Sequence, residues 1–221
     1  MSFAHCTTPS GASTPVKSKP RARYKLVYGV GLNDSTALNP THIDGRNVKS
    51  YNLWTAMLKR CYSTKFQKEG STYIGCSVAE VWHSFAAFEA WYTENYFEGA
   101  ALDKDLLVPD NRVYGPDTCA FVPQALNNLL LVCSATRGIH PLGVYFHKPS
   151  QKYIAHISIG TVSTHLGYFL TPLAAHKAWQ LAKADILESF PADNPRIRKA
   201  LDLRALQLRD DCANGRITTK L

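Results

Sequence analysis

Two carboxylates and an asparagine-bearing loop lie close together near the middle of the chain. Asp103 and Asp105 are two positions apart in a short run that we expect to be extended, and on a regular strand both side chains would point to one face. Such a pair could hold a hard cation such as magnesium. The loop and then an expected helix follow, up to Asn128. This order of parts is typical of small nucleases that hold one metal ion against a phosphodiester.

The segment 102–128 reads LDKDLLVPDNRVYGPDTCAFVPQALNN. It resembles the phage-encoded HNH-type homing endonucleases, in the branch whose motif reads LD(K/R)(D/I), then GN, then Y-x-P-x-x-C-x-(F/W)-V. The likeness continues upstream in Tyr28–Asp34, in W-x-x-M-x-x-R-C-Y from Trp54 to Tyr62, and in C-x-V-x-x-x-W-x-x-F-x-x-F from Cys76 to Phe88. It covers most of the chain and implies a helical HNH-like module of the ββα-metal type that nicks or cleaves DNA.

The resemblance also implies roles for individual residues. Two carboxylates would bind one Mg²⁺ or Mn²⁺, a loop asparagine would orient the loop, and a helix asparagine would supply the third polar position. The implied catalytic set is Asp103, Lys104, Asp105, Asn111 and Asn127, with Asn128 as the alternative to Asn127 and with Asp103 and Asp105 as the metal ligands.

Lys104 stands where an HNH motif has its first histidine, the general base. A lysine in water has a pKa of about 10.4 and stays charged at neutral pH unless burial lowers that pKa. We therefore expect Lys104 to contact phosphate, while a metal-bound water attacks with help from Asp105. The alternative is a carboxylate-capped turn in a fold that has lost catalysis.

A second HNH-like string, THIDGRN, runs from Thr41 to Asn47. It precedes the expected helices and lacks the hairpin and helix that should follow at once. We interpret it as a polar turn, with His42 as a minor alternative for the site.

Charge favours a polyanionic partner. The 221 residues carry a formal net charge of +8, and lysine and arginine near phosphates gain affinity by releasing counterions. Residues 1–33 contain no acid, and Ser10 to Lys25 combines Ser, Pro and Gly with five basic residues, which predicts a flexible basic arm or a plain disordered terminus. Candidate phosphate contacts are Lys59, Arg60, Arg112 and Arg137, with ordinary solvated surface as the alternative.

Composition limits the remaining classes. A hydrophobic fraction of 45% is enough to bury a core in one or two small domains. The six cysteines are scattered without a C-x-x-C pair, so we expect them to be reduced and mostly buried rather than in a zinc ribbon or a disulfide framework. No apolar run approaches the roughly 18 residues that span a membrane, and no hydrophobic signal core begins the chain. We expect no membrane contact and a cytoplasmic location, in a bacterial host cell if the protein is phage-encoded.

Two apolar stripes predict amphipathic helices before the motif. The first consists of Leu53, Trp54, Met57, Leu58 and Cys61, and the second of Val78, Val81, Trp82, Phe85, Glu89 and Tyr92. Carboxylates cluster at Asp103, Asp105, Asp110 and Asp117, and none occurs from Thr118 to Ala184. A hydrolase that needs paired carboxylates cannot find them in that later stretch.

The stretch after Gly143 predicts three short strands and a helix. Turn residues at 148–151 and at Gly160 separate the strands, and Thr171 with Pro172 forms a helix N-cap and first position. On the middle strand, positions 153, 155, 157 and 159 alternate with positions 152, 154, 156 and 158. One face should therefore pack on the helix while the other can meet a ligand.

This unit resembles the ethylene-response-factor (APETALA-type) DNA-binding domain, whose G-V, K-(W/Y)-x-A-x-I and L-G-x-F are matched by Gly143–Val144, Lys152–Ile157 and Leu166–Phe169. The resemblance implies a three-stranded sheet in the major groove of double-stranded DNA. The residues expected at the DNA are Tyr145, His147, Lys148, Lys152, His156, Ser158, Ser163 and His165. Because these are polar residues and histidines rather than arginine and tryptophan, we expect weaker, more shape-dependent or pH-sensitive binding. A metal site from His140, His147, His156, His165 and His176 is an alternative, although they lie on different elements.

The last region, 191–221, predicts an amphipathic helix that either packs back on the body or makes a homodimer contact. The full expectation is an α+β protein with a flexible arm at 1–24, an HNH-like module at 25–136, a sheet-plus-helix DNA-binding module at 137–190 and a C-terminal helix and tail. The expected function is a phage DNA endonuclease of HNH type. The alternatives are a non-catalytic DNA-binding or host-defence-interfering protein on a degenerate nuclease scaffold, and an inhibitor that binds only a protein target.

Overall fold

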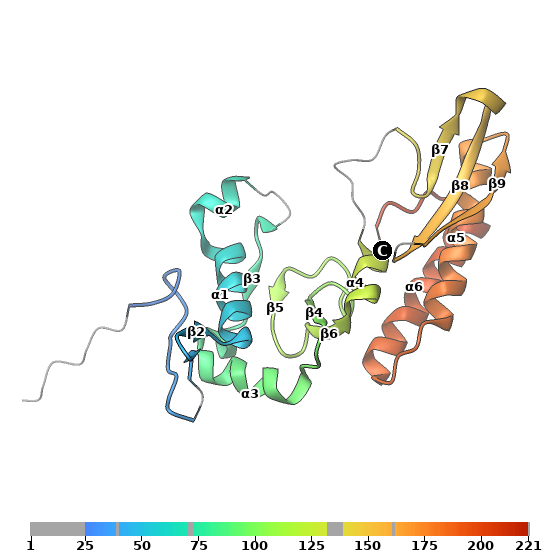
Figure 1. Cartoon of the computed structure of the whole chain (residues 1–221). Coiled ribbons are helices and arrows are strands. Elements are labelled where there is room, and N and C mark those ends of the chain that lie inside the picture. Colours follow the sequence, from blue (N-terminus) through green and yellow to red (C-terminus); the bar gives the residue numbers. More distant parts are fainter. Residues whose placement is uncertain (1–24, 39, 70–72, 132–138, 161, 221) are drawn as a thin grey trace, which may run out of the picture.

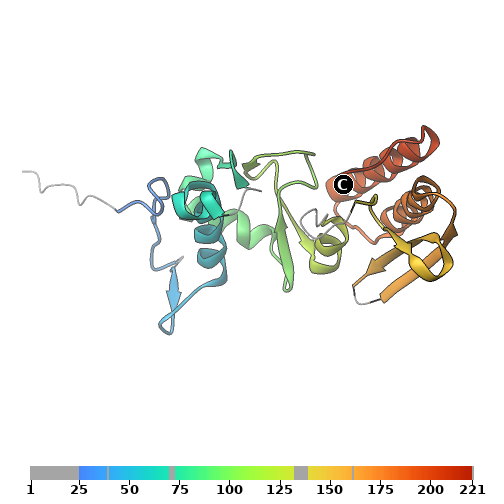
Figure 2. The ribbon, with the colours of Figure 1, turned by 90° about the horizontal axis from the view of Figure 1, so that it is seen from above.

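The fold mixes helices with small sheets and is of the α+β class, as predicted (Figure 1). The computed structural model describes residues 25–38, 40–69, 73–131, 139–160 and 162–220. The expected basic arm and Arg137 lie outside these residues. Figure 2 shows the order of parts from above: the N-terminal helices at one end, a small central unit, and the C-terminal sheet with its helices at the other end.

The N-terminal part begins with a hairpin of β1 (His42–Ile43) and β2 (Arg46–Asn47), followed by α1 (Lys49–Tyr62) and α2 (Thr64–Glu69). The hairpin turn at Asp44 and Gly45 has positive φ at both positions, so the predicted polar turn is confirmed. The expectation that this string lacks a hairpin and a following helix is wrong, because β1 and β2 form a hairpin and α1 begins two residues after it. Trp54, Met57 and Leu58 are fully buried on α1, which confirms the first predicted stripe.

The second predicted helix is confirmed only from Phe85 on, because the helix does not extend before Ser84. Val78 lies in β3 (Ser77–Val78), a 3₁₀ turn η2 (Glu80–His83) follows, and α3 (Phe85–Asn95) begins only after that. The Ser84 hydroxyl accepts a hydrogen bond from the Ala87 amide at 3.0 Å and donates to Asp34 Oδ2 at 2.6 Å. This N-cap starts a new helix and leaves Val81 exposed on the turn.

The central unit is a two-stranded sheet followed by a helix. β4 (Ala100–Asp103) pairs antiparallel with β6 (Ala120–Pro123), and α4 (Gln124–Leu130) follows β6 directly. We call these three elements the ββα unit. Between its strands, β5 (Val113–Tyr114) pairs in parallel with β3 and so joins the unit to the N-terminal helices.

The C-terminal part confirms the predicted strands and turns. β7 (Val144–His147), β8 (Lys152–Ile159) and β9 (Val162–Phe169) form an antiparallel sheet in that order, with the short 3₁₀ turn η3 (Lys148–Ser150) after β7. α5 (Pro172–Ser189) covers one face of the sheet, and the Thr171 hydroxyl caps it by accepting from the Ala174 amide at 3.1 Å.

α6 (Pro195–Ala213) packs back on the body, which was one of its two predicted arrangements. Its buried Leu201 and Leu208 share one apolar core with Val122 and Leu126 of the ββα unit and with Leu187 of α5. This core therefore spans the boundary expected at residue 136.

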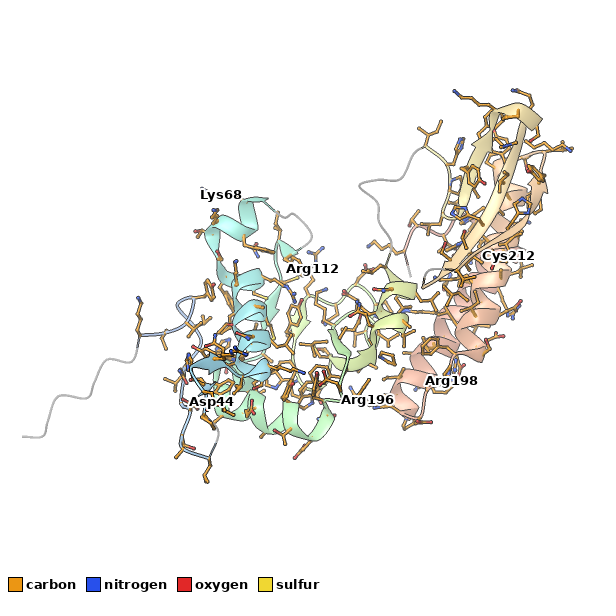
Figure 3. The ribbon with its side chains drawn as sticks, viewed as in Figure 1. Asp44, Lys68, Arg112, Arg196, Arg198 and Cys212 are labelled. Carbon is orange, nitrogen blue, oxygen red and sulfur yellow. The ribbon has the colours of Figure 1, made fainter. Side chains whose placement is uncertain are left out.

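Two arginines labelled in Figure 3 fix the beginning of α6. Arg196 donates to the Asp117 carbonyl before β6, and Arg198 donates to the Leu187 and Phe190 carbonyls, both at 2.8 Å. Within the described ranges, no helix combines the length and the apolar character needed to cross a membrane.

Candidate functional site

The five residues predicted as catalytic line a single cleft of about 1310 Å³. The ββα unit and the β4–β5 loop form one wall, and α6 with the tail after it forms the other. The chain end returns beside α4 in both ribbon views, and the Lys220 ammonium contacts Asp110 of the loop at 2.6 Å. The structure thus brings together residues that the sequence spreads over more than 100 positions.

Asp103 ends β4 and turns the chain. Its Oδ1 accepts hydrogen bonds from the Asp105 amide at 2.8 Å and from the Leu106 amide at 2.6 Å. The expectation that Asp103 and Asp105 share one face of a regular strand is therefore wrong, because the aspartate side chain competes for backbone donors and stops the strand. Asp105 lies in the bend after the strand, with a half-exposed side chain.

Lys104 is held inside the loop. Its ammonium donates to Asp105 Oδ1 at 2.5 Å and to the Asn111 carbonyl at 3.0 Å, and it lies 6.0 Å from the centre of the Tyr114 ring. The side chain is only 11% exposed, so in this structure its charge faces the protein rather than a phosphate.

Asn111 ties the two ends of the loop together. Its amide group donates to the Lys104 carbonyl at 2.8 Å and to the Val113 carbonyl at 2.7 Å, and its oxygen accepts from the Val113 amide at 3.0 Å. Of the two helix asparagines, Asn127 lines the cleft, whereas the Asn128 oxygen accepts from Gln124 on the same helix.

Arg204 of α6 is the cleft residue whose role the sequence did not assign. It is 8% exposed, and its guanidinium donates to the Leu106 carbonyl and, at 2.5 Å, to the Asp105 carbonyl. Burial lowers the pKa of this arginine, and the charges of Asp103 and Asp105 partly offset that effect. Its position in the apolar stripe of α6 was the available signal, since a cation there needs internal acceptors.

In this arrangement the two carboxylates are partly engaged within the loop. One oxygen of Asp103 is occupied by two amides, and Asp105 is paired with the Lys104 ammonium. Among the described residues, no group of three or more histidine, cysteine, aspartate or glutamate side chains is arranged to hold a metal. This also applies to the described histidines of the alternative metal site. Of these, the buried His176 contacts the Leu142 carbonyl and the Thr218 amide instead.

Of the candidate phosphate contacts, only Arg112 lines the cleft among the described residues. Arg112 lines it and donates to the Ile74 carbonyl at 2.5 Å (Figure 3). Arg60 lies over the Tyr73 ring at 5.5 Å, and Lys59 lies over the Phe66 ring at 5.9 Å. His42 does not reach the cleft, because it contacts Thr41 and the Tyr51 ring at the hairpin.

The second candidate surface is the face of the β7–β8–β9 sheet that α5 does not cover. Ala155 and Ile157 are buried on the α5 side, and the strand register places the intervening β8 residues on the other side with their partners. The residues predicted at DNA gather there or at its edge: Tyr145, His147, Lys148, Lys152, His156, Ser158, Ser163 and His165.

Tyr168 joins this open face and was missed from the sequence. The register shifts from Ala155 opposite Gly167 to His156 opposite His165, so Leu166 is an extra residue in β9. A β-bulge of this kind reverses the alternation beyond it and brings Tyr168 beside Ile154, on the same face as His165. Gly167, with φ of +140°, is the only local hint of the bulge.

Three cysteines of the described residues are buried. Cys61, Cys76 and Cys119 are free and buried, as expected, and burial raises the pKa of Cys61 and of Cys119 to about 12.

No protein-family model matches the sequence, and no curated protein or solved structure is significantly similar to it.

Proposed function

We propose that this chain is a DNA-binding protein of the HNH-endonuclease type, in which the ββα unit holds DNA without cutting it. The observation that carries DNA binding is the charge of the C-terminal sheet unit. No carboxylate occurs from Thr118 to Ala184, and the open face of the sheet carries three histidines, with Lys148 and Lys152 at one end of the β7–β8 hairpin. A surface without acids keeps the attraction for phosphates that a net charge of +8 provides.

The contacts inside the ββα cleft favour binding over cutting. The Asp103 carboxylate caps a turn, and Lys104 is neutralised by Asp105. A general base needs an oxygen or nitrogen that can accept a proton from the attacking water, whereas here one oxygen of Asp103 already accepts two amide hydrogen bonds and Lys104 is paired with Asp105. The motif residues thus support a loop that can lie against a DNA backbone, with Arg112 at the cleft for phosphate.

The test combines cleavage and binding in one experiment. Purified protein is incubated with supercoiled plasmid and with phage genomic DNA, in magnesium, in manganese or with a chelator, beside a band-shift lane. We expect a shifted band that weakens as salt rises, and no nicked product under any condition. Metal-dependent nicking would contradict the non-catalytic proposal, and salt-insensitive or absent DNA binding would favour an inhibitor of a protein target.

The second candidate function is metal-dependent nicking. The gathering of Asp103, Asp105, Asn111 and Asn127 in one cleft favours it. In that case the double variant Asp103→Ala/Asp105→Ala would lose cleavage and keep its band shift. The matched control is Asp202→Ala, which removes an exposed carboxylate that pairs with Arg198 on α6, away from the cleft.

A further inference from the structure

The open face of the β7–β8–β9 sheet presents aromatic rings. Tyr145 of β7 is 43% exposed and Tyr168 of β9 is 50% exposed. They flank Ile154 of β8, which is buried although it lies on the same open face. Two tyrosine rings therefore cover an apolar centre and leave much of their own surface to solvent.

Neighbouring rings hold the two tyrosines in place. The Tyr168 ring contacts His165 at 4.9 Å and His147 at 5.6 Å between ring centres, and the Tyr145 ring contacts His156 edge-on at 5.3 Å. Fixed aromatic side chains lose little conformational freedom when a flat ligand stacks on them. The face is thus already arranged to receive planar groups.

The charge of this surface fits a polyanion. No acid and no arginine occurs in 144–169, so the segment has no arginine for the bidentate contact to guanine in the major groove. Lys148 and Lys152 are exposed at the end of the β7–β8 hairpin, where a backbone phosphate can approach. Aromatic rings beside cations are the usual means of binding unpaired nucleotides.

Spacing also favours unpaired bases. Tyr145 and Tyr168 lie on the two outer strands, which puts them roughly 10 Å apart at two strand spacings. Successive bases in duplex DNA are only about 3.4 Å apart. Two bases that each cover one tyrosine must therefore be unstacked from one another.

We propose that this sheet face binds unpaired nucleotides of DNA, with bases stacked on Tyr145 and Tyr168 and the backbone beside Lys148 and Lys152. The inference rests on the proposed DNA binding and specifies its mode: the ββα unit contacts the duplex backbone, and the sheet takes a single-stranded stretch. Gapped, flapped or locally opened DNA is then the preferred substrate class.

The test is fluorescence anisotropy of the full chain with one labelled sequence as a single strand, as a blunt duplex and as a gapped duplex. We expect the single-stranded and gapped probes to bind at least tenfold more tightly than the blunt duplex. Tyr145→Leu and Tyr168→Leu should each weaken single-strand binding about 5- to 100-fold, whereas the matching Phe variants keep the ring and the affinity. Phe97→Leu, at an exposed ring outside the sheet, is the control.

The outcomes separate this inference from the proposed function. Equal binding of the three probes with no effect of either Leu variant, but weakening by Lys148→Ala/Lys152→Ala, would overturn the stacking mode and leave DNA binding intact. Absence of binding to every probe would overturn both. Because RNA bases can stack on the same rings, an RNA strand of the corresponding sequence is included, and tenfold tighter binding of that RNA would overturn the assignment to DNA. Unchanged thermal melting of the Leu variants would show that they fold.

Discussion

Lys183 should make the stability of this protein rise with pH relative to a variant that lacks its charge. The side chain is 5% exposed, and its ammonium donates to the Leu129 carbonyl at the end of α4 and lies 5.8 Å from the centre of the Trp179 ring. Burial lowers the pKa of Lys183 from 10.5 to about 8. The ion pairs found in the described part of the chain do not include it.

The sign follows from proton binding in the two states. Between pH 8 and 10.5 the unfolded chain keeps the Lys183 proton and the folded chain loses it, so stability rises with pH across this window and is lost as pH falls through 8. At pH values where Lys183 is charged in both states, a shift of this size lowers the free energy of unfolding by about 3 kcal/mol. Raising the pH from 7 to 10 removes about 2 to 3 kcal/mol of that penalty. Lys183→Met has no such dependence, because it carries no titrating group at this position.

The assay is urea unfolding of the wild type and of Lys183→Met at pH 7, 8, 9 and 10. Over this range, the free energy of unfolding of the wild type should rise by about 2 to 3 kcal/mol relative to that of the variant. Cys61 and Cys119 have raised pKa values and destabilise both proteins equally at high pH, so their effect cancels in the difference. Lys199→Met, at an exposed position on α6, controls for the loss of one charge. If the free energy of unfolding of the wild type, relative to that of Lys183→Met, stays constant or falls from pH 7 to pH 10, the assignment of a buried, destabilised ammonium is refuted.

Three further predictions concern the contacts that fix the elements. Arg204→Met leaves the Asp105 and Leu106 carbonyls without a donor, and should cost about 2 kcal/mol in urea unfolding and speed amide exchange in 104–112; unchanged exchange there would contradict its positioning role. Gly143→Ala should cost more than about 1 kcal/mol, because φ is +72° and a Cβ would lie 1.9 Å from the Trp179 ring; thermal melting equal to wild type would contradict this. Asp34→Ala should cost about 1 kcal/mol through its lost bonds to Ser84 and Ala86, and unchanged melting would refute that contribution to the start of α3.

The sequence predicts those elements whose signals are local. The turns at 148–151 and Gly160, the N-cap at Thr171 and the apolar stripe of α1 all follow from residues within one or two turns of each other, and the structure confirms them. The single helix expected from Val78 to Tyr92 is wrong because its break depends on Asp34, about 50 positions away, whose carboxylate supports the Ser84 cap. The spacing of apolar residues along a helix gives no information about a capping partner so distant in the sequence.

The candidate site divides in the same way. The residues of the site could be predicted from a short motif, but the hydrogen bonds that they make inside the protein could not. The strand ends at Asp103 because its carboxylate accepts hydrogen bonds from the backbone amides that follow, and Arg204 contacts the loop from nearly 100 positions away. Tyr168 escaped prediction because one extra residue in β9 reverses the alternation on which the face assignment depended.

The two candidate surfaces differ in what their side chains contact. Those of the ββα cleft bond mainly within the protein, whereas the tyrosines of the open sheet face remain half exposed. In the ββα cleft, Asp103, Lys104 and Asn111 bond mainly to the loop that carries them, so the same residues that resemble a catalytic motif are needed to hold the backbone in place. Such a motif can persist after catalysis is lost, because folding alone requires it. Tyr145 and Tyr168 contribute little to the core beyond covering Ile154, and they keep about half of their surface in water. Exposed rings without a structural need are the better indication of a ligand, and they direct the first binding experiments to the sheet rather than to the cleft.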